Sequence, residues 1–446
     1  MAVIRPFRGV RYNPAKVPDL SAVISQPYDR VRYGLQDKYY DLSPYSIVRI
    51  IKGKEKERDN TERNVYTRAR DTYQSWLQEG ILMRENVPAL YVLHQTFTLP
   101  DGSTRTRRGL MAALELTRFD EGTVLPHERT HSGPKVDRLN LLRATEVNFG
   151  HIFMLYPGDR INELLGTAIE EPALGPSKGK GGVELREMFE HDVIQRFSVV
   201  TDREVIASVV EEMAPKRNLI IADGHHRYET ALNYRDEMRA QYSNAPPNAG
   251  FNYRMVTLVS MDDPGLVILP THRLIHSYGR MNMEEALERA KEYFEVTPVA
   301  DRAALEAALA QADPSHPRFG LYGGTYALLT LRDPAALEQL LPKRDPNWRL
   351  LDVSVLHELF IERVLGVDKA AVERLENINY LRDVQMGYDA VDRGEADFLL
   401  VMNPTRMEQV QACTKAGEKM PQKSTDFYPK VISGLVALPV AAGERL

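Results

Sequence analysis

Two spacings of hydrophobic residues recur along the chain, and together they predict a protein that mixes helices and strands. Residues 61–80 repeat apolar and aromatic side chains at helical spacing, and Gly80 is a favourable C-terminal cap for such a helix. Residues 89–119 place apolar, partly alternating segments on both sides of the turn Pro100-Asp101-Gly102-Ser103, which predicts a β-hairpin.

The same patterns assign most of the remaining chain. Further helices are expected at 135–145, 204–213, 284–294, 302–311, 350–365 and 406–416, and one from Tyr228 onward. Further strands are expected at 151–156, 193–200, 218–222, 253–261, 266–269 and 396–402, with a second hairpin at 320–331 and loops at 174–182 and 242–250. The fold class expected is therefore α/β (mixed α+β), with a mixed sheet at its core.

The length of the chain predicts more than one domain. Its 446 residues exceed the roughly 250–300 that a single hydrophobic core usually supports. The composition shifts near Met281, where helices rich in alanine and glutamate begin. We therefore expect a mixed α/β domain at 1–280 and a second, C-terminal α/β domain at 281–446.

Charge and cysteine content narrow the classes of partner. The net charge is −5, and no basic helix-turn-helix face is evident, so DNA is an unlikely partner. No run approaches roughly 18 apolar residues and no signal peptide is evident, so we expect a cytoplasmic protein without a membrane span. The single cysteine, Cys413, excludes a disulfide within the chain and is expected to pack in a helix. A homo-oligomer is compatible with this composition.

The most informative segment is the turn Asp223-Gly224-His225-His226-Arg227. An apolar strand ends there at an acid and a glycine, and a helix begins. Unpaired N–H groups at a helix N-terminus favour an anion, and glycine lets the backbone approach a ligand closely. Arg227 adds a bidentate donor for phosphate or carboxylate, and the two histidines can donate hydrogen bonds. The turn therefore predicts a phosphate-binding site.

Structural interpretations of the same turn remain open. Asp223 can cap the helix, Arg227 can pair with an acid, and the two histidines can be exposed. A metal site is a further alternative, but adjacent histidines at the start of a helix point roughly 100° apart.

A second polar segment, His127 to Lys135, is bounded by glycine and proline. Glu128 is a candidate general base with His127 as its neighbour. Lys135 and Arg138 lie three residues apart on the following helix, so they share one face and are candidate phosphate ligands. A solvated loop beside a charged helix face is the alternative.

A third polar segment, 423–430, combines lysines and hydroxyl groups after Pro421 without the glycine framework of a Walker A loop. Its candidate phosphate ligands are Lys423, Ser424, Thr425 and Lys430. We expect this segment and the His127–Glu128 loop to fold onto the same cleft as the Asp223 turn. A solvated loop is again the alternative.

His272 and Arg273, in Pro270-Thr271-His272-Arg273, end a strand-like run and are further candidates for the anion site, although both can equally face water. The chain contains no Gly-x-Ser-x-Gly elbow, His-Glu-x-x-His helix or Gly-x-Gly-x-x-Gly turn. Serine hydrolase, zinc protease and Rossmann interpretations therefore lose their usual support.

The Asp223 turn resembles the phosphate-binding motif of the ParB and sulfiredoxin superfamily, in which glycine, a basic or polar residue and arginine open a helix. Its Asp-Gly-His-His-Arg form is most similar to that of the free-serine kinases. This resemblance covers about fifteen residues. It implies a phosphate-binding unit of the ParB/sulfiredoxin type.

A broader resemblance extends over nearly the whole chain. The sequence is similar to a bacterial and archaeal family of conserved hypothetical proteins, domain-of-unknown-function family 1015. The matching segments are Gln26-Pro27-Tyr28-Asp29, Pro44-Tyr45-Ser46, His127-Glu128-Arg129-Thr130, the Asp223 turn, Leu269-Pro270-Thr271-His272-Arg273 and Met420-Pro421-Gln422-Lys423-Ser424-Thr425. The family usually has two prolines before the tyrosine, and Gln26 replaces the first.

The residues and the resemblance together favour an enzyme that transfers phosphate from a nucleotide or other donor to a small hydroxylated metabolite, such as serine. In this hypothesis His127, Glu128, Asp223, His225 and His226 are the catalytic candidates. Because a polyphosphate donor carries more negative charge than these side chains neutralise, Mg²⁺ is expected, with Asp223 orienting it. No haem, flavin or PLP is expected. A phosphohydrolase and a nucleotide-binding regulator of the ParB type are the alternatives.

Overall fold

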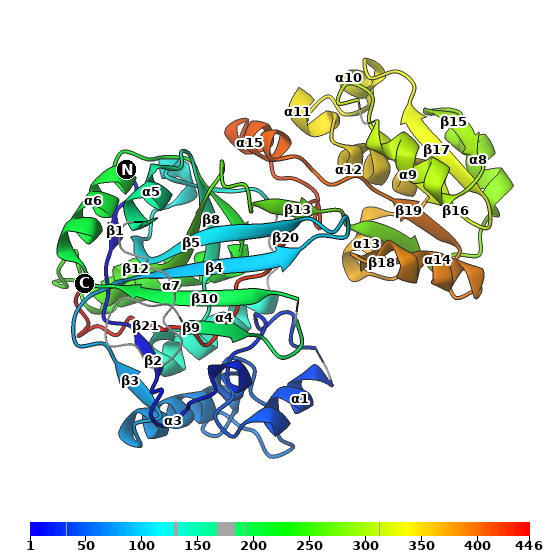
Figure 1. Cartoon of the computed structure of the whole chain (residues 1–446). Helices are drawn as coiled ribbons and strands as arrows, with labels where there is room; N and C mark the ends of the chain where they lie inside the picture. The colour runs from blue at the N-terminus through cyan, green and yellow to red at the C-terminus, as the bar shows by residue number, and fades with distance from the viewer. Residues whose placement is uncertain (33, 129–132, 167–182, 191, 312) are drawn as a thin grey trace. The chain divides into compact units, whose positions relative to one another are not determined.

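The computed structural model describes residues 1–446 except 33, 129–132, 167–182, 191 and 312 (Figure 1). The chain forms two compact units. Unit 1 comprises 1–126, 130–267 and 429–446, and unit 2 comprises 127–129 and 268–428. The boundary expected at 280/281 thus lies at 267/268 instead, and the last 18 residues return to unit 1.

Unit 1 is built on a mixed nine-stranded sheet with the order β6-β11-β8-β12-β5-β4-β10-β9, and β1 pairs with β5. The strands are β1 (Ile4–Arg5), β4 (Leu90–Thr98), β5 (Thr104–Glu115), β6 (Val124–Pro126), β8 (Ile152–Tyr156), β9 (Val183–Arg186), β10 (Ile194–Val200), β11 (Leu219–Asp223) and β12 (Tyr253–Ser260). Figure 1 shows the expected β4–β5 hairpin in the sheet. Two short ladders join β2 (Val10–Tyr12) to β3 (Leu82–Arg84) and β7 (Val147–Asn148) to β21 (Leu438–Pro439).

Helices bury one face of this sheet in a continuous apolar core. Alternate residues of β4, β5, β8 and β12 pack there against α5 (Arg160–Gly166), α6 (Arg203–Met213) and α7 (His225–Gln241). A second core joins α2 (Val48–Ile51), α3 (Val65–Gln78) and α4 (Gly133–Thr145). The other helical segments of the unit are α1 (Leu35–Leu42), η1 (Leu20–Ala22), η2 (Phe119–Glu121) and η3 (Gly250–Asn252).

The alternate positions of the central strands include buried polar side chains. Gln95 on β4 donates to Gln195 on β10 and to the carbonyl of Lys430, and Arg107 on β5 donates to Gln95 and to the carbonyl of Pro429. Buried polar groups require such partners, because an unpaired one costs about 1–3 kcal/mol. These bonds fasten the returning segment, which begins at Pro429, to the sheet.

Unit 2 is an antiparallel six-stranded sheet with the order β15-β17-β16-β19-β14-β18. Its strands are β14 (His272–Ile275), β15 (Phe294–Val299), β16 (Arg318–Tyr322), β17 (Tyr326–Leu331), β18 (Ile378–Leu381) and β19 (Phe398–Val401), and β13 (Val267–Leu269) pairs separately with β20 (Asp426–Tyr428). Its helices are α8 (Met283–Ala290), α9 (Arg302–Ala310), α10 (Ala336–Leu340), α11 (Pro346–Arg349), α12 (Asp352–Val355), the π-helix η4 (Leu356–Val364), α13 (Lys369–Arg374), α14 (Val384–Asp392) and α15 (Met407–Lys415).

Helices cover both faces of the unit 2 sheet. One face packs against α9 and α14 in an apolar cluster that contains Leu305 and Tyr388. On the other face Phe294 and Phe319 contact Phe360 of η4, with ring centroids 6.3 and 5.4 Å from it. Both units combine helices with sheet, so the mixed α/β class expected from the sequence is confirmed.

Several expected elements have different limits. The helix expected at 284–294 ends at Ala290, and Phe294 already belongs to β15. The helix expected at 350–365 is divided into α12 and η4. His272 begins a strand rather than ending one. The expected loop 174–182 lies outside the described residues, and no described helix combines the length and apolar character needed to cross a bilayer.

Candidate anion-binding site

The corner between β11 and α7 has the strand–glycine–helix geometry expected from the sequence. Gly224 is the N-cap of the 17-residue helix α7, with φ +97°, a region that residues with a side chain rarely adopt. A Cβ atom at this position would lie 3.0 Å from Nε of Arg227. Glycine is therefore favoured by the backbone conformation, and any larger residue would also push the guanidinium of Arg227 away by a few tenths of an ångström.

Asp223 and Arg227 form an ion pair across this corner. Nη2 of Arg227 lies 2.5 Å from Oδ2 of Asp223, four residues earlier. Burial alone would raise the pKa of Asp223, but the positive charges of Arg227 and then Lys430 lower it to about 2. His225 and Arg30 act in the same direction. The corner thus gathers more positive than negative charge around one carboxylate.

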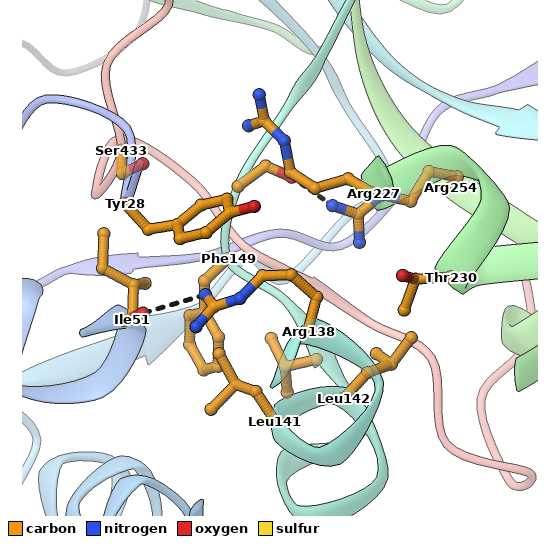
Figure 2. A pocket seen from close by; sticks show the side chains of 12 residues that line it. Tyr28, Ile51, Arg138, Leu141, Leu142, Phe149, Arg227, Thr230, Arg254 and Ser433 are labelled. Carbon is orange, nitrogen blue, oxygen red and sulfur yellow. Dashed lines mark hydrogen bonds between the residues drawn. The ribbon is translucent and has the colours of Figure 1, made fainter. Parts of the chain in front are cut away.

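A cavity of about 50 Å³ opens beside this corner in unit 1. Figure 2 shows the side chains of Arg138, Arg227, Arg254 and Tyr28 around this cavity. The guanidinium carbons of Arg138 and Arg227 lie 4.0 and 6.0 Å from the Tyr28 ring centroid. The described lining thus holds three guanidinium groups and no carboxylate, while residues such as Leu141 and Phe149 form an apolar wall.

Arg254 is the most unusual of these residues. Its side chain is 94% buried and donates from Nη2 to the carbonyl of Gly150 at 2.6 Å, but in the described chain its buried Nε has no partner. Burial lowers the pKa of Arg254 to about 9, with the charges of Arg227 and Arg138 adding to the effect. A buried cation without a carboxylate partner is costly, so this side chain is poised to meet an anion.

His151 lies next to this group of charges. Its Nδ1 is 3.1 Å from the hydroxyl of Thr257, and within the described residues its buried Nε2 has no partner. Burial lowers the pKa of His151 to about 3, and the charges of Arg227 and Arg254 contribute. The ring is therefore neutral at pH 7, and one of its nitrogens lacks a hydrogen-bond partner.

The candidate residues of unit 1 that the sequence suggested differ in how close they lie to the cavity and the Asp223 corner. His225 is buried and His226 half-buried at the start of α7, and Lys430 is buried with its charge close enough to lower the pKa of Asp223. Arg138 lines the cavity, donates to the carbonyl of Ile51 at 2.8 Å and forms an ion pair with Asp137 at 2.6 Å. Lys135 forms an ion pair with Glu229 of α7 and, unlike Arg138, does not line the cavity.

His127 and Glu128 of the second polar segment meet Thr425 of the third within unit 2. Nε2 of His127 is 2.7 Å from the Thr425 hydroxyl, and that oxygen is 3.4 Å from Oε1 of Glu128. His127 is fully buried against Phe427, whereas Glu128 is partly exposed. That these residues act together with the Asp223 turn stays a prediction.

The remaining candidates are part of the internal framework of unit 2. His272 accepts a hydrogen bond at Nδ1 from the Met402 N–H (3.1 Å), and burial lowers its pKa to about 4. Arg273 is 98% buried and donates to the carbonyls of Thr271 and Lys423. Both side chains are buried, so the alternative in which they face water is wrong. Phosphate binding by His272 and Arg273 stays a prediction.

Ser424 and Lys423 also have structural roles in this segment. Oγ of Ser424 donates to the carbonyl of Pro421 at 2.5 Å, and its own carbonyl accepts from Thr405 at 2.7 Å. Lys423 has φ +56°, a strained conformation for a residue with a side chain. Phosphate binding by this pair stays a prediction.

A metal held by protein side chains alone is not supported. The described residues contain no group of three or more His, Cys, Asp or Glu side chains placed to hold a metal ion. Asp223 supplies a single carboxylate and already pairs with Arg227. These residues fit only a magnesium ion whose remaining ligands are phosphate oxygens and water.

Sequence reasoning missed four residues of this site. Tyr28 belongs to the segment Gln26-Pro27-Tyr28-Asp29, which was used only for the family resemblance, and Arg30 follows it. Arg254 and His151 were placed in expected strands. A signal for Arg254 was present, because a charged residue within a run that reads as a buried strand requires a partner. Gln26 itself donates to Glu187 and Glu190, so the replacement of proline there supplies two hydrogen bonds.

A protein family is similar to this chain in sequence, and several solved structures are similar to it in structure. The model of a family described as "Protein of unknown function (DUF1015)" matches residues 4–354. The chain belongs to this family. The match includes the Tyr28 loop, Glu128, the Asp223 corner and Arg254, and it ends before the segment 423–430. No curated protein has a matching sequence.

Similar solved structures cover 73% of this chain. They include a free serine kinase in complex with AMP (14% identity, 92% of that chain, TM-score 0.33), a conserved hypothetical protein from Pyrococcus furiosus (13%, 95%, 0.33) and C-terminally truncated SbnI from Staphylococcus aureus (11%, 87%, 0.33). Such low TM-scores and identities do not establish a shared ligand or activity. A ParB/sulfiredoxin-like architecture for unit 1 stays a prediction.

Proposed function

We propose that unit 1 binds the phosphate of a nucleotide or another phosphate donor at the Asp223 corner, and that the protein transfers this phosphate to a small hydroxylated metabolite. The observation that carries the proposal is the described lining of the cavity, which has three guanidinium groups and no carboxylate. Arginine presents planar, bidentate donors that match phosphate, and α7 directs its positive N-terminal dipole at the same corner.

The size of the cavity limits what it can hold. A water molecule needs roughly 10–15 Å³ of such space, so about 50 Å³ admits a few waters or one phosphate-sized group. The nucleoside of a nucleotide donor would therefore lie outside the cavity. Besides burial, the positive charges of Arg227 and Arg138 lower the pKa of Arg254. A phosphate that enters the cavity would offset this repulsion among the three arginines.

Asp223 and Arg227 have distinct roles in this proposal. Arg227 would neutralise charge on the phosphate, while Asp223, ionised because its pKa is about 2, holds the guanidinium in place and would supply a carboxylate ligand to a donor-bound Mg²⁺. The ion would neutralise charge on the donor phosphates. Glu128 is proposed as the base that accepts the proton of the attacking hydroxyl, a role that rests on its sequence context and its partly exposed carboxylate.

Two measurements on the whole protein test the proposal in sequence. The first is a thermal-shift titration with pyrophosphate, ADP, ATP and CTP, each with and without Mg²⁺, in which at least one donor is expected to raise the melting temperature. The second incubates that donor with hydroxylated metabolites, serine included, and detects phosphorylated product.

The results separate the alternatives. Release of inorganic phosphate without a phosphorylated metabolite would favour a phosphohydrolase. Donor binding without turnover would favour a regulatory protein. Absence of stabilisation by every donor would contradict phosphate binding itself.

A further inference from the structure

Unit 2 contains a second pocket that the proposed phosphate chemistry does not use. Its volume is about 260 Å³, and its walls come from the end of α9, the loop 313–318, the start of α12 and the segment 403–409. Two arginines, Arg318 and Arg406, line it together with the carboxyls of Asp352 and Asp313, of which Asp313 already bonds His316. Apolar surface is supplied by residues such as Leu309 and Pro404.

The two arginines lack the partners that arginines near a protein interior normally have. Within the described chain neither Arg318 nor Arg406 forms an ion pair with a carboxylate, and the buried Nε of Arg318 makes no hydrogen bond. Both charges nevertheless lie close enough to Asp352 to lower its pKa. The pocket thus presents guanidinium donors that a carboxylate or another planar anion would satisfy.

Asp352 supplies the opposite polarity. One of its oxygens accepts a hydrogen bond from the backbone N–H of Arg318 at 3.1 Å, and no other partner is formed by this side chain in the described part of unit 2. Burial raises the pKa of Asp352 to about 6, although the backbone hydrogen bond and both arginines oppose the rise. A cation at this carboxyl would stabilise its ionised form, because opposite charge favours ionisation.

We propose that this pocket binds a small zwitterion of the α-amino-acid class. The carboxylate of the ligand would pair with Arg318 and Arg406, its ammonium group would pair with Asp352, and a short apolar side chain would contact the Leu309 wall. The carboxylate of such a ligand would give the two arginines a partner, and its ammonium group would give Asp352 one. A simple anion would leave Asp352 without a partner, and a simple amine would leave the guanidinium groups without one.

The test is isothermal titration of the full-length protein with matched probes. L-leucine and L-alanine represent the zwitterion, 4-methylpentanoate and propanoate are their deaminated counterparts, and 3-methylbutylamine and ethylamine are their decarboxylated counterparts. The remaining protein amino acids form the rest of the panel. At least one amino acid is expected to bind, and removal of either charged group should weaken binding roughly 10- to 100-fold, the scale of a charge-assisted hydrogen bond.

Variants locate the binding in this pocket. Asp352→Asn keeps an acceptor for the Arg318 N–H, and Arg318→Met keeps the length of the side chain; each is expected to weaken amino-acid binding at least tenfold. Arg302→Met, on the same unit but paired with Glu306, is the control and should bind as the wild type does. Thermal melting of each variant verifies that it folds.

Three outcomes would overturn the proposal. No amino acid in the panel binds, a deaminated or decarboxylated probe binds as tightly as its parent, or folded Asp352→Asn and Arg318→Met variants keep wild-type affinity. Phosphate binding in unit 1 is measured separately with pyrophosphate, so failure here leaves the proposed function standing.

Discussion

Replacing Arg254 with methionine is expected to raise the stability of the protein while removing much of its affinity for phosphate. The change deletes a buried charge and keeps a side chain of similar length. The pKa of Arg254 falls from its ordinary value of 12.5 to about 9. At 1.36 kcal/mol per unit of pKa, keeping this group charged destabilises the folded protein by about 5 kcal/mol.

Methionine recovers that cost only in part. The carbonyl of Gly150 would lose the hydrogen bond that it accepts from Arg254, and an unpaired buried carbonyl costs about 1–3 kcal/mol. The net expectation is a rise of about 2–4 kcal/mol in the free energy of unfolding. Urea unfolding at pH 7, followed by circular dichroism with and without pyrophosphate, measures both effects.

Arg235 is the matched control. It is also a buried arginine of unit 1, but it pairs with Asp236 and donates to the carbonyl of Leu116. Arg235→Met is therefore expected to destabilise the fold. If Arg254→Met lowers the free energy of unfolding as Arg235→Met does, or binds pyrophosphate as tightly as the wild type, Arg254 is a structural residue and the reasoning about its unmet charge is refuted.

Three further predictions concern neighbouring groups. A histidine in the unfolded chain becomes protonated below pH 6.5, but folded His151 does so only near pH 3, so the free energy of unfolding should fall as pH falls between these values. His151→Gln should flatten the slope of unfolding free energy against pH by up to about 1.4 kcal/mol per pH unit. An unchanged slope would exclude this role for His151. Gly224→Ala should lower the free energy of unfolding in urea by about 1–3 kcal/mol and weaken pyrophosphate binding. Gly34→Ala is the control, because Gly34 has φ +84° but no atom within 4 Å of the added Cβ, and it should cost less and bind pyrophosphate normally. Equal effects of the two variants would argue against the contact with Arg227. Glu128→Gln should leave donor binding intact and reduce turnover about 10²–10⁴-fold in a steady-state assay, and loss of binding with unchanged turnover per bound donor would make Glu128 a binding residue.

Local signals in the sequence were sufficient for the corner of the site. An apolar strand, a glycine and a polar helix start lie within fifteen residues, and each is recognised from its neighbours in the chain. The structure places this strand as β11 and this helix as α7, with Gly224 between them. The β4–β5 hairpin was predicted for the same reason, because its turn chemistry is local.

Residues that meet through the tertiary fold could not be found in this way. Arg254 reaches the cavity from β12 and Tyr28 from a loop more than 200 residues earlier, and no local pattern links them. The return of the chain to unit 1 at Pro429 depends on hydrogen bonds from Arg107 and Gln95. The spacing of hydrophobic residues along the chain cannot predict such bonds either. The π-helix η4 was read as regular helix because its apolar pattern does not distinguish the two.

The measurement that tests the central claim most directly is the affinity of the whole protein for pyrophosphate before and after Arg227→Ala. Isothermal titration should show binding by the wild type and a loss of about 1.5–3 kcal/mol in the variant, which is roughly a 10- to 150-fold weaker Kd. Thermal melting establishes that the variant is folded. Equal affinity of the two folded proteins, or no binding by the wild type, would contradict a phosphate site at the Asp223 corner.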